Sequence, residues 1–448
     1  MAIATNVVRS FGIHVRVRPP IRAARERACG RGSLALATLA VAVCLPIPAE
    51  EWPDFRGPGA QGQSATTGLP VAFGPESLVE WKVAVPGKGW STPIVDGGRV
   101  FLTTAVPSSE SPPARQSLRA MCLDASTGAT VWDKELFSKD MSKAKSHTKN
   151  SFASPSAITD GRHVFFHFGP DGTAALDRDG TTVWSVDTLA YDPQHGAGSS
   201  PVFAGGVLVF TGDGVADPFI AALDRASGKV AWKTPRPEMP DPKWSFCTPL
   251  FIEAAGKRQV VSPAAYMVCS YDAETGRELW RVRYPNKWSV VPRPVSSHGM
   301  VFVCTGYDGP AELLAIRPDG AGDVTDSHVV WRTDDNVPHN PSPLVVGDCL
   351  YLVADAGIAS CRDVATGELR WRKRLGGNFS SSPVHSGGVI WIVSEQGVCT
   401  AFKASPEGYE ELGTSDMGEP VLASLAPAEG SFFLRTEGHL YRLGNAAK

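Results

Sequence analysis

The chain has 448 residues, of which 43% are hydrophobic and 20% are charged, and its formal net charge is -3. This charge gives no global positive field, so general binding of nucleic acid or of an anionic membrane surface is excluded. The 45 glycines and 36 prolines predict many turns and argue against long helices.

Residues 1–49 are predicted to be a signal peptide or an uncleaved signal anchor. Arginines precede the apolar run LALATLAVAVCLPIPA, which extends from Leu34 to Ala49. The run is short for a membrane span, so cleavage after Ala49 and export to the periplasm or the cell exterior are expected. A retained anchor would be the only link to a membrane. Lipidation of Cys44 is a third alternative, which the bulky Val43 disfavours.

An extended segment is expected at residues 50–78, followed by one repeat domain at residues 79–448. Two motifs alternate in that domain. One is LDASTGATVWDKEL, from Leu123 to Leu136, and the other is STPIVDGGRVFLTT, from Ser91. The prolines that mark eight copies of the second motif are Pro93, Pro155, Pro201, Pro249, Pro294, Pro343, Pro383 and Pro420.

Each pair of motifs predicts four antiparallel strands. The proline begins a strand, a glycine turn follows, and a β-branched run makes the second strand. The third strand carries a segment such as that at Asp124, the TG pair turns the chain, and the fourth strand ends on tryptophan. The repeated aspartates are interpreted as turn formers. The sequence therefore predicts an all-β, eight-bladed β-propeller of four-stranded antiparallel blades.

The tryptophan strands begin one step before the first proline motif. Trp81 precedes Pro93, whereas the last unit, GHLYRLGN, lacks a tryptophan strand. The N-terminal strand around Trp81 is therefore predicted to close the last blade. Tyr409 is expected at the eighth tryptophan position. The residues expected to pack between blades are Trp81, Trp132, Trp184, Trp232, Trp280, Trp331 and Trp371.

The A-x-D-x-x-T-G-x-x-x-W pattern and the proline motif resemble the repeats of the pyrroloquinoline-quinone (PQQ) β-propellers. That family includes quinoprotein dehydrogenases and exported, non-catalytic propellers such as the lipoprotein of the outer-membrane β-barrel assembly machine. The segment EWPDFRGPGAQGQSATTGLP, from Glu51 to Pro70, resembles a further group of exported single propellers.

The resemblance implies two functions. The favoured one is a monomeric binding or scaffold module for protein, peptide or glycan partners at the cell envelope, without a catalytic residue or cofactor. The alternative is a PQQ- or metal-dependent oxidoreductase for alcohols or sugars, with PQQ and calcium. Such a dehydrogenase would carry adjacent cysteines and a calcium-binding set. The chain has no Cys-Cys pair and no loop of alternating acidic calcium ligands.

Polar residues in the loops before the proline motifs are predicted to form a ligand site. These loops enter the innermost strands, so their side chains should meet at one mouth of the channel. The predicted members are Asn150, His195, Arg293, His339 and Asn378, with Trp244, Ser245 and Asn340 beside them. Arg293 would supply positive charge for a carboxylate or a sugar. Asp213 and Asp217 are added as candidate polar-ligand or metal ligands, with an Asx-turn as the alternative.

Seven cysteines follow the leader, and most lie in apolar strand-like runs. They are interpreted as buried free thiols. A disulfide between Cys349 and Cys361 is an alternative in an oxidising compartment.

Overall fold

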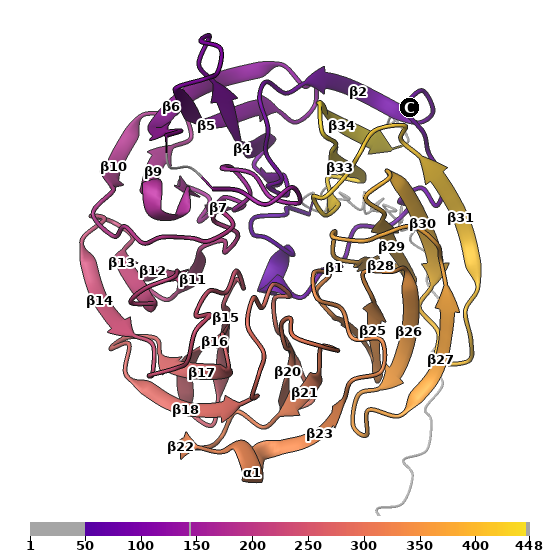
Figure 1. Ribbon diagram of the computed structural model, residues 1–448. Helices are drawn as coiled ribbons and strands as arrows, with labels where there is room; N and C mark the ends of the chain where they lie inside the picture. Colours follow the sequence, from indigo (N-terminus) through magenta and orange to yellow (C-terminus); the bar gives the residue numbers. More distant parts are fainter. Residues whose placement is uncertain (1–49, 143–144, 445–448) are drawn as a thin grey trace, which may run out of the picture. The chain divides into compact units, whose positions relative to one another are not determined.

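The computed structural model describes residues 50–142 and 145–444. The predicted signal segment lies outside these residues. The described chain forms eight antiparallel sheets of four principal strands each, which follow one another around a ring (Figure 1). The all-β, eight-bladed propeller predicted from the sequence is therefore confirmed.

The first four blades follow the chain in order. Blade 1 contains β3 (Ile94–Asp96), β4 (Arg99–Pro107), β5 (Arg115–Asp124) and β6 (Thr130–Asp140). Blade 2 contains β7 (Ile158–Thr159), β8 (His163–His167), β9 (Thr173–Asp177) and β10 (Thr182–Val186). Blade 3 contains β11 (Val202–Ala204), β12 (Val207–Gly212), β13 (Phe219–Asp224) and β14 (Val230–Pro235). Blade 4 contains β15 (Leu250–Ala254), β16 (Lys257–Ala264), β17 (Met267–Asp272) and β18 (Glu278–Arg283), with β22 (Gly322–Asp323) added in parallel.

The other four blades complete the ring. Blade 5 contains β19 (Val295–Ser297), β20 (Met300–Cys304), β21 (Leu313–Ile316) and β23 (Val329–Thr333). Blade 6 contains β24 (Leu344–Val346), β25 (Cys349–Val353), β26 (Ile358–Asp363) and β27 (Leu369–Arg374). Blade 7 contains β28 (Val384–Ser386), β29 (Val389–Val393), β30 (Val398–Lys403) and β31 (Glu411–Asp416), with β1 (Gln63–Ser64) added. Blade 8 contains β32 (Ala426–Ala428), β33 (Ser431–Arg435), β34 (His439–Gly444) and β2 (Val79–Ala84).

Helical turns are few and short. They are η1 (Pro58–Ala60), η2 (Gly169–Asp171) and α1 (Thr325–His328). Across residues 50–142 and 145–444, no helix has the length and hydropathy needed to cross a membrane.

The N-terminal strand closes the ring, as the position of Trp81 predicts. β2 pairs antiparallel with β34, with Trp81 opposite Arg442 and Val83 opposite Leu440. The last sheet thus combines segments from both ends of the described chain. This pairing satisfies the edge of β34 that would otherwise be open.

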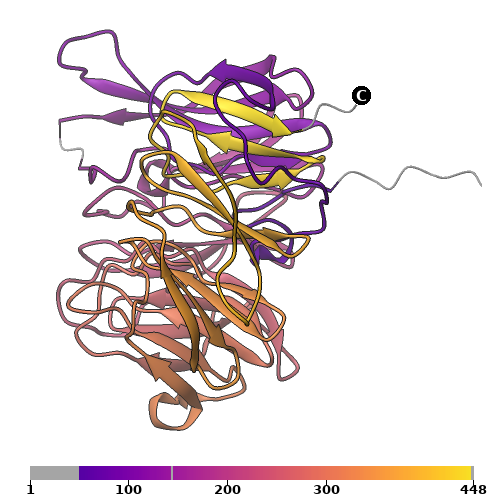
Figure 2. The same cartoon turned by 90° about the vertical axis from the view of Figure 1, so that its right-hand side faces the viewer.

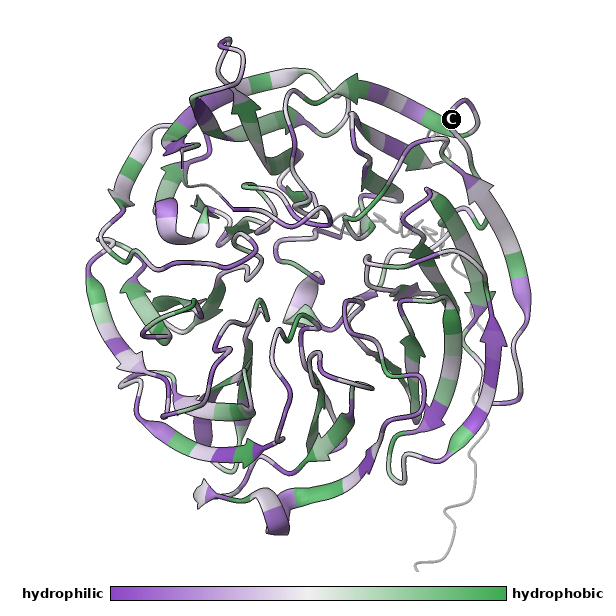
Figure 3. Cartoon of the chain, viewed as in Figure 1, coloured by the Kyte–Doolittle hydropathy of each residue, from purple (hydrophilic) through white to green (hydrophobic). Residues whose placement is uncertain are grey.

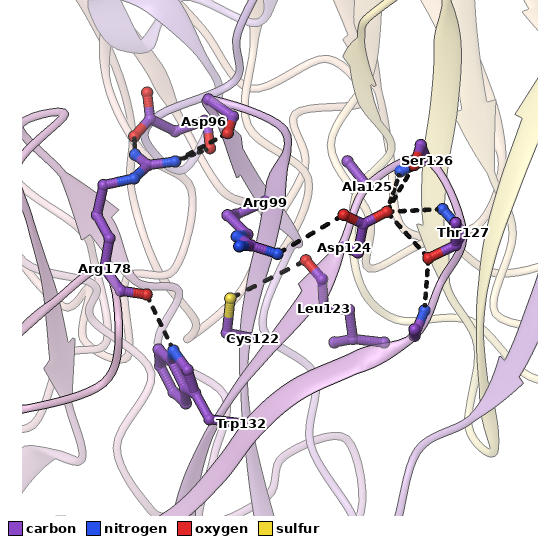
Figure 4. Close-up of polar contacts among 12 residues, drawn as sticks. Asp96, Arg99, Cys122, Leu123, Asp124, Ala125, Ser126, Thr127, Trp132 and Arg178 are labelled. Carbon is purple, nitrogen blue, oxygen red and sulfur yellow. Dashed lines mark hydrogen bonds and ion pairs between the residues drawn. The ribbon is translucent and has the colours of Figure 1, made fainter.

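The repeated tryptophans lie between neighbouring blades. The Trp132 indole N–H donates to the Arg178 carbonyl oxygen of the next blade at 3.0 Å (Figure 4). The ring also lies against Gly180, which has a φ of 81°, and a Cβ there would come within 2.9 Å of the indole. This turn, in which Gly180 follows Asp179, therefore needs glycine both for its backbone conformation and for the approach of the tryptophan.

The aspartate of each motif stabilises the same turn. Asp124 Oδ1 accepts hydrogen bonds from the backbone N–H groups of Ser126 at 3.1 Å and Thr127 at 2.9 Å (Figure 4). Hydrogen bonds from the Ser126 and Thr127 hydroxyls, together with these backbone bonds, lower the pKa of Asp124. Hydrophobic residues dominate the inner strands, whereas the outermost strands mix both kinds (Figure 3).

Three details of the predicted repeat are wrong. Tyr409 precedes β31 and packs against Trp371, while Gly413 takes the eighth tryptophan position opposite Ala401. Blade 8 begins its innermost strand six residues after Pro420, and Pro155 likewise precedes the start of β7 by three residues. In both cases the local sequence is longer than the regular loop.

The described cysteines are free thiols, and all of them are buried. No disulfide joins Cys349 to Cys361. Burial raises the pKa of Cys122 to about 12, so this thiol is held in its unreactive protonated form.

Candidate functional site

A ring of hydroxyl side chains surrounds the central cavity where the innermost strands begin. We call it the hydroxyl ring, and its members are Thr92, Ser156, Ser200, Thr248, Ser342, Ser382 and Ser424. Each hydroxyl oxygen accepts the backbone N–H of the equivalent residue in the preceding blade, over 2.9–3.2 Å. Blade 5 has Arg293 at this position, and its backbone N–H donates to Ser342. The ring thus links the blades around the axis.

The N-terminal segment closes one end of this cavity. We call residues 52–63 the plug. Trp52, which is fully buried, pairs with Val95 of blade 1, while Arg56 donates to the carbonyl oxygens of Pro343 at 2.8 Å and Pro383 at 2.7 Å. Figure 2 shows the indigo N-terminal segment on the right-hand face of the ring, opposite the magenta loops after β6. The plug therefore contacts blades that lie far apart in the sequence.

Phe55 of the plug forms the floor of a cavity of about 110 Å³, which we call the neck. The hydroxyl ring lines the neck. A second set of residues also lines the neck, and in each blade it is the residue two positions before the hydroxyl-ring position. These eight residues are Trp90, Ser154, Gly198, Phe246, Val291, Asn340, Ser380 and Leu422. The spacing of two fits extended backbone, in which alternate side chains share a face.

The neck opens into a cavity of about 410 Å³, which we call the mouth. Its wall is rich in aromatic rings, namely Trp90, Trp244, Phe246, Trp288 and Tyr307. The same eight residues that border the neck also line the mouth. The two cavities therefore adjoin along the axis of the ring.

Polar side chains lie between these rings, and they include two histidines and a lysine. The rings of His147 and His195 lie 5.5 Å apart between centroids. Burial and the neighbouring His147 lower the pKa of His195, so the neutral imidazole is favoured there. Lys149 pairs with Glu395 at 2.7 Å, and Glu395 also accepts a bond of 2.6 Å from the Ser380 hydroxyl.

Asn150 and His195, both predicted as site residues, line the mouth together with Trp244 and Asn340. The Asn150 amide donates to the backbone oxygens of His195 at 2.9 Å and Ala197 at 3.2 Å. Asn150 therefore holds in place the loop of the next blade that contains His195 and Ala197.

His339 and Asn378 lie beside the mouth and do not form its wall. His339 stacks on Tyr307 with ring centroids 4.3 Å apart, so it supports a wall residue from behind. The backbone N–H of Asn378 donates to Gln396 Oε1 at 3.1 Å.

Arg293 does not face the mouth, contrary to the prediction. Its side chain is 1% exposed and forms an ion pair of 3.1 Å with Asp54 of the plug. The guanidinium also donates to the carbonyl oxygens of Phe55 and of Pro249, the latter at 3.1 Å. Sequence reasoning missed this because the partner carboxylate lies 239 residues away.

Asp213 and Asp217 also lie apart from the mouth. The buried Asp213 carboxylate forms a two-pronged ion pair with Arg236, at 2.8 Å and 2.7 Å. Asp217 is an exposed turn residue with a φ of 49°. Among the residues that the structure describes, no group of three His, Cys, Asp or Glu side chains could hold a metal ion.

The sequence analysis missed Trp90, Trp288, Tyr307 and Lys149 as wall residues. One signal could have found Trp90: it lies three residues before Pro93, as Phe246 lies three before Pro249. Trp288 and Tyr307 form an isolated β-bridge between two loops, a contact that no sequence pattern specifies.

The repeats and the ring define the class of this protein: it is a PQQ-repeat-like β-propeller with eight blades. More particularly, residues 216–320 and 320–408 match the family model of the outer membrane protein assembly factor BamB. The matched repeats run from blade 3 into blade 7. The chain is thus similar to BamB over these residues.

Solved structures share the fold at low identity. BamB from Moraxella catarrhalis is 14% identical with a TM-score of 0.56, covering 82% of this chain and 98% of that one. Quinohemoprotein alcohol dehydrogenase from Comamonas testosteroni is 11% identical with a TM-score of 0.62, covering 89% and 81%. A europium-containing methanol dehydrogenase is 10% identical with a TM-score of 0.61, covering 88% and 98%. No curated protein sequence matches the chain.

Proposed function

We propose that this protein is an exported binding module that holds a protein or peptide partner at the cell envelope. The observation that carries the proposal is the aromatic mouth, a concave cavity of about 410 Å³ with three tryptophans in its wall. Tryptophan and tyrosine provide large contact areas at a low cost in conformational entropy, and they dominate the binding energy of many interfaces.

The other residues that line the mouth favour a binding role over a catalytic one. Among the described residues that line the mouth, none is a carboxylate, and the one lysine, Lys149, is paired with Glu395. Phe55 of the plug lines the neck, and the neck adjoins the mouth, so we expect a ligand to enter by the mouth. The similarity to BamB, a factor of outer membrane protein assembly, favours a protein partner.

Export is part of the proposal. Glu50, which would be the first residue after cleavage at Ala49, already contributes to the fold. Its carboxylate accepts the backbone N–H groups of Ala65 at 2.8 Å and Thr66 at 2.7 Å. Removal of the leader would therefore leave these contacts intact, and mass spectrometry of the mature protein should find Glu50 at the N-terminus.

A quinone-dependent oxidoreductase is the alternative, and the residues of the mouth do not fit its cofactor. PQQ carries three carboxylates, and burying them needs paired positive charge. Lys149 pairs with Glu395, and burial disfavours the charged form of His195. No calcium-binding cluster accompanies them within the described ranges. If the purified chain nevertheless retained added PQQ and calcium in its absorption spectrum, the alternative would replace the binding module.

The proposal is tested with the double variant Trp244→Ala/Trp288→Ala. Tagged full-length protein is cross-linked in the cells that produce it, and the envelope proteins attached to it are identified. We expect a partner that the wild type captures and the double variant loses. Leu369→Ala is the control, because this exposed side chain lies on the outer strand β27. Equal capture by all three proteins would contradict the proposal.

A further inference from the structure

The hydroxyl ring has hydrogen-bonding capacity that the fold does not use. Each of its oxygens accepts one backbone N–H, as described above. Among the described residues, none of these hydroxyls donates its hydrogen to a protein acceptor. A serine or threonine hydroxyl has one donor hydrogen, so the ring can direct several O–H donors at a ligand in the neck.

Two buried arginines lie behind the lining of the neck, where they bond to backbone groups beside Ser342, Ser382 and Phe55. Arg56 and Arg293 are each 1% exposed, and Arg293 pairs with Asp54, which is the one carboxylate among the described residues that contacts either guanidinium. Arg56 instead donates to backbone carbonyl oxygens. Burial and the nearby Arg293 lower the pKa of Arg56 to about 9, so this guanidinium still carries its charge at neutral pH. Two cations against one anion leave a net positive charge behind the lining of the neck, and this charge favours an anion there.

The size and position of the neck select a small anionic group at the end of a longer ligand. Its volume of about 110 Å³ accommodates a carboxylate with water, but not a bulky side chain. Eight residues line both the neck and the mouth, so a ligand that reaches the hydroxyl ring also contacts the aromatic wall. A peptide C-terminus offers this combination, because its terminal carboxylate and last side chain leave the same carbon atom.

We propose that the neck captures the C-terminal carboxylate of a peptide whose last apolar side chain lies in the aromatic mouth. This inference rests on the proposed function and names the part of the partner that is bound. The O–H groups of the ring donate to the carboxylate, and the net positive charge of Arg56, Arg293 and Asp54 stabilises it. Carboxylate capture by converging neutral donors is a recurrent mode of peptide recognition.

The test uses N-acetyl-phenylalanine and N-acetyl-phenylalaninamide as probes for the full-length protein, with tryptophan fluorescence and calorimetry as readouts. The two probes differ only in the terminal group. Because a hydrogen bond to a charged group is stronger than one to a neutral group, we expect the acid to bind roughly tenfold to a hundredfold more tightly than the amide. Equal binding of acid and amide would overturn the inference but leave the aromatic mouth as a binding site.

Variants of the ring identify the donors. Ser342→Ala/Ser382→Ala should lose most of the preference for the acid, whereas Ser342→Thr/Ser382→Thr should retain it, because Thr92 and Thr248 already occupy equivalent positions. The threonine pair also shows whether a loss reflects unfolding. Ser297→Ala, outside both cavities, is the matched control.

Acetate is the third probe and separates the two sources of a carboxylate. If acetate binds as tightly as N-acetyl-phenylalanine, the neck is a site for free small anions and the peptide assignment is wrong. If neither phenylalanine compound binds, the inference is also wrong. The partner-capture experiment with Trp244→Ala/Trp288→Ala then decides separately whether the proposed function stands.

Discussion

The joint between blades 4 and 5 depends on one buried glutamine, Gln259, which is 1% exposed. At the other tryptophan joints the indole N–H donates directly to a backbone carbonyl of the next blade, but Trp280 donates to Gln259 Oε1 at 2.8 Å. The Gln259 amide then donates to Pro318 of blade 5 at 2.9 Å and to Ala254 at 3.0 Å, and Ser270 donates to Oε1 at 2.7 Å. Gln259 thus connects Trp280 of blade 4 to Pro318 of blade 5, a connection that we call the relay, whereas at the other joints the tryptophan bonds to the next blade directly.

We predict that Gln259→Leu lowers the free energy of unfolding by roughly 2–6 kcal/mol. Leucine has a similar size, so little cavity forms, but all four groups that bond the Gln259 amide lose this partner. The range counts the two that join the blades, the Trp280 N–H and the Pro318 carbonyl. Each buried polar group left unsatisfied costs about 1–3 kcal/mol. The measurement is urea unfolding followed by tryptophan fluorescence, with hydrogen exchange of β16 and β18 to localise the effect.

A double-mutant cycle isolates the relay. Trp280→Phe removes the donor that needs Gln259, so the double variant should be less destabilised than the sum of the two single variants. Ser270→Ala is the mild control and should cost about 1 kcal/mol. If Gln259→Leu unfolds within 0.5 kcal/mol of the wild type, where ordinary surface substitutions fall, or if the two effects are additive, the relay does not bridge the blades.

Three further predictions concern the closure of the ring by β2, the ion pair between Asp54 of the plug and Arg293, and the carboxylate of Glu419. A chain that begins at Trp90 lacks β2, and its melting temperature should fall because the edge of β34 is left unpaired; an unchanged melting temperature would refute closure. Asp54→Ala should cost about 3–5 kcal/mol in urea unfolding, because buried Arg293 loses its partner, whereas Glu76→Ala in the same segment should not. Although burial opposes it, hydrogen bonds from His439 and other groups lower the pKa of Glu419 to about 2 from 4.5. Stability should therefore fall as the pH drops from 4.5 to 2, and Glu419→Gln should flatten this dependence in thermal melts.

The candidate site was only partly predictable. Asn150 and His195 line the mouth, since the loop before an innermost strand must open near the axis. Arg293 precedes Pro294 in the same way, yet it faces the plug. A local motif specifies the position of a backbone segment. It does not specify which distant segment competes for the side chain.

The sequence by itself determined the repeat, because each blade is built from local signals. The TG glycines set turns with positive φ, the aspartates cap them, and the displaced Trp81 strand requires closure by β34. Only the tertiary structure decided what the N-terminal segment does and where a ligand can bind. The plug acquires its role by contacts such as that of Arg56 with Pro383, 327 residues apart, and the mouth exists because eight loops converge on one axis. Contacts of such separation form only when the ring is closed, and no local pattern in the chain specifies them.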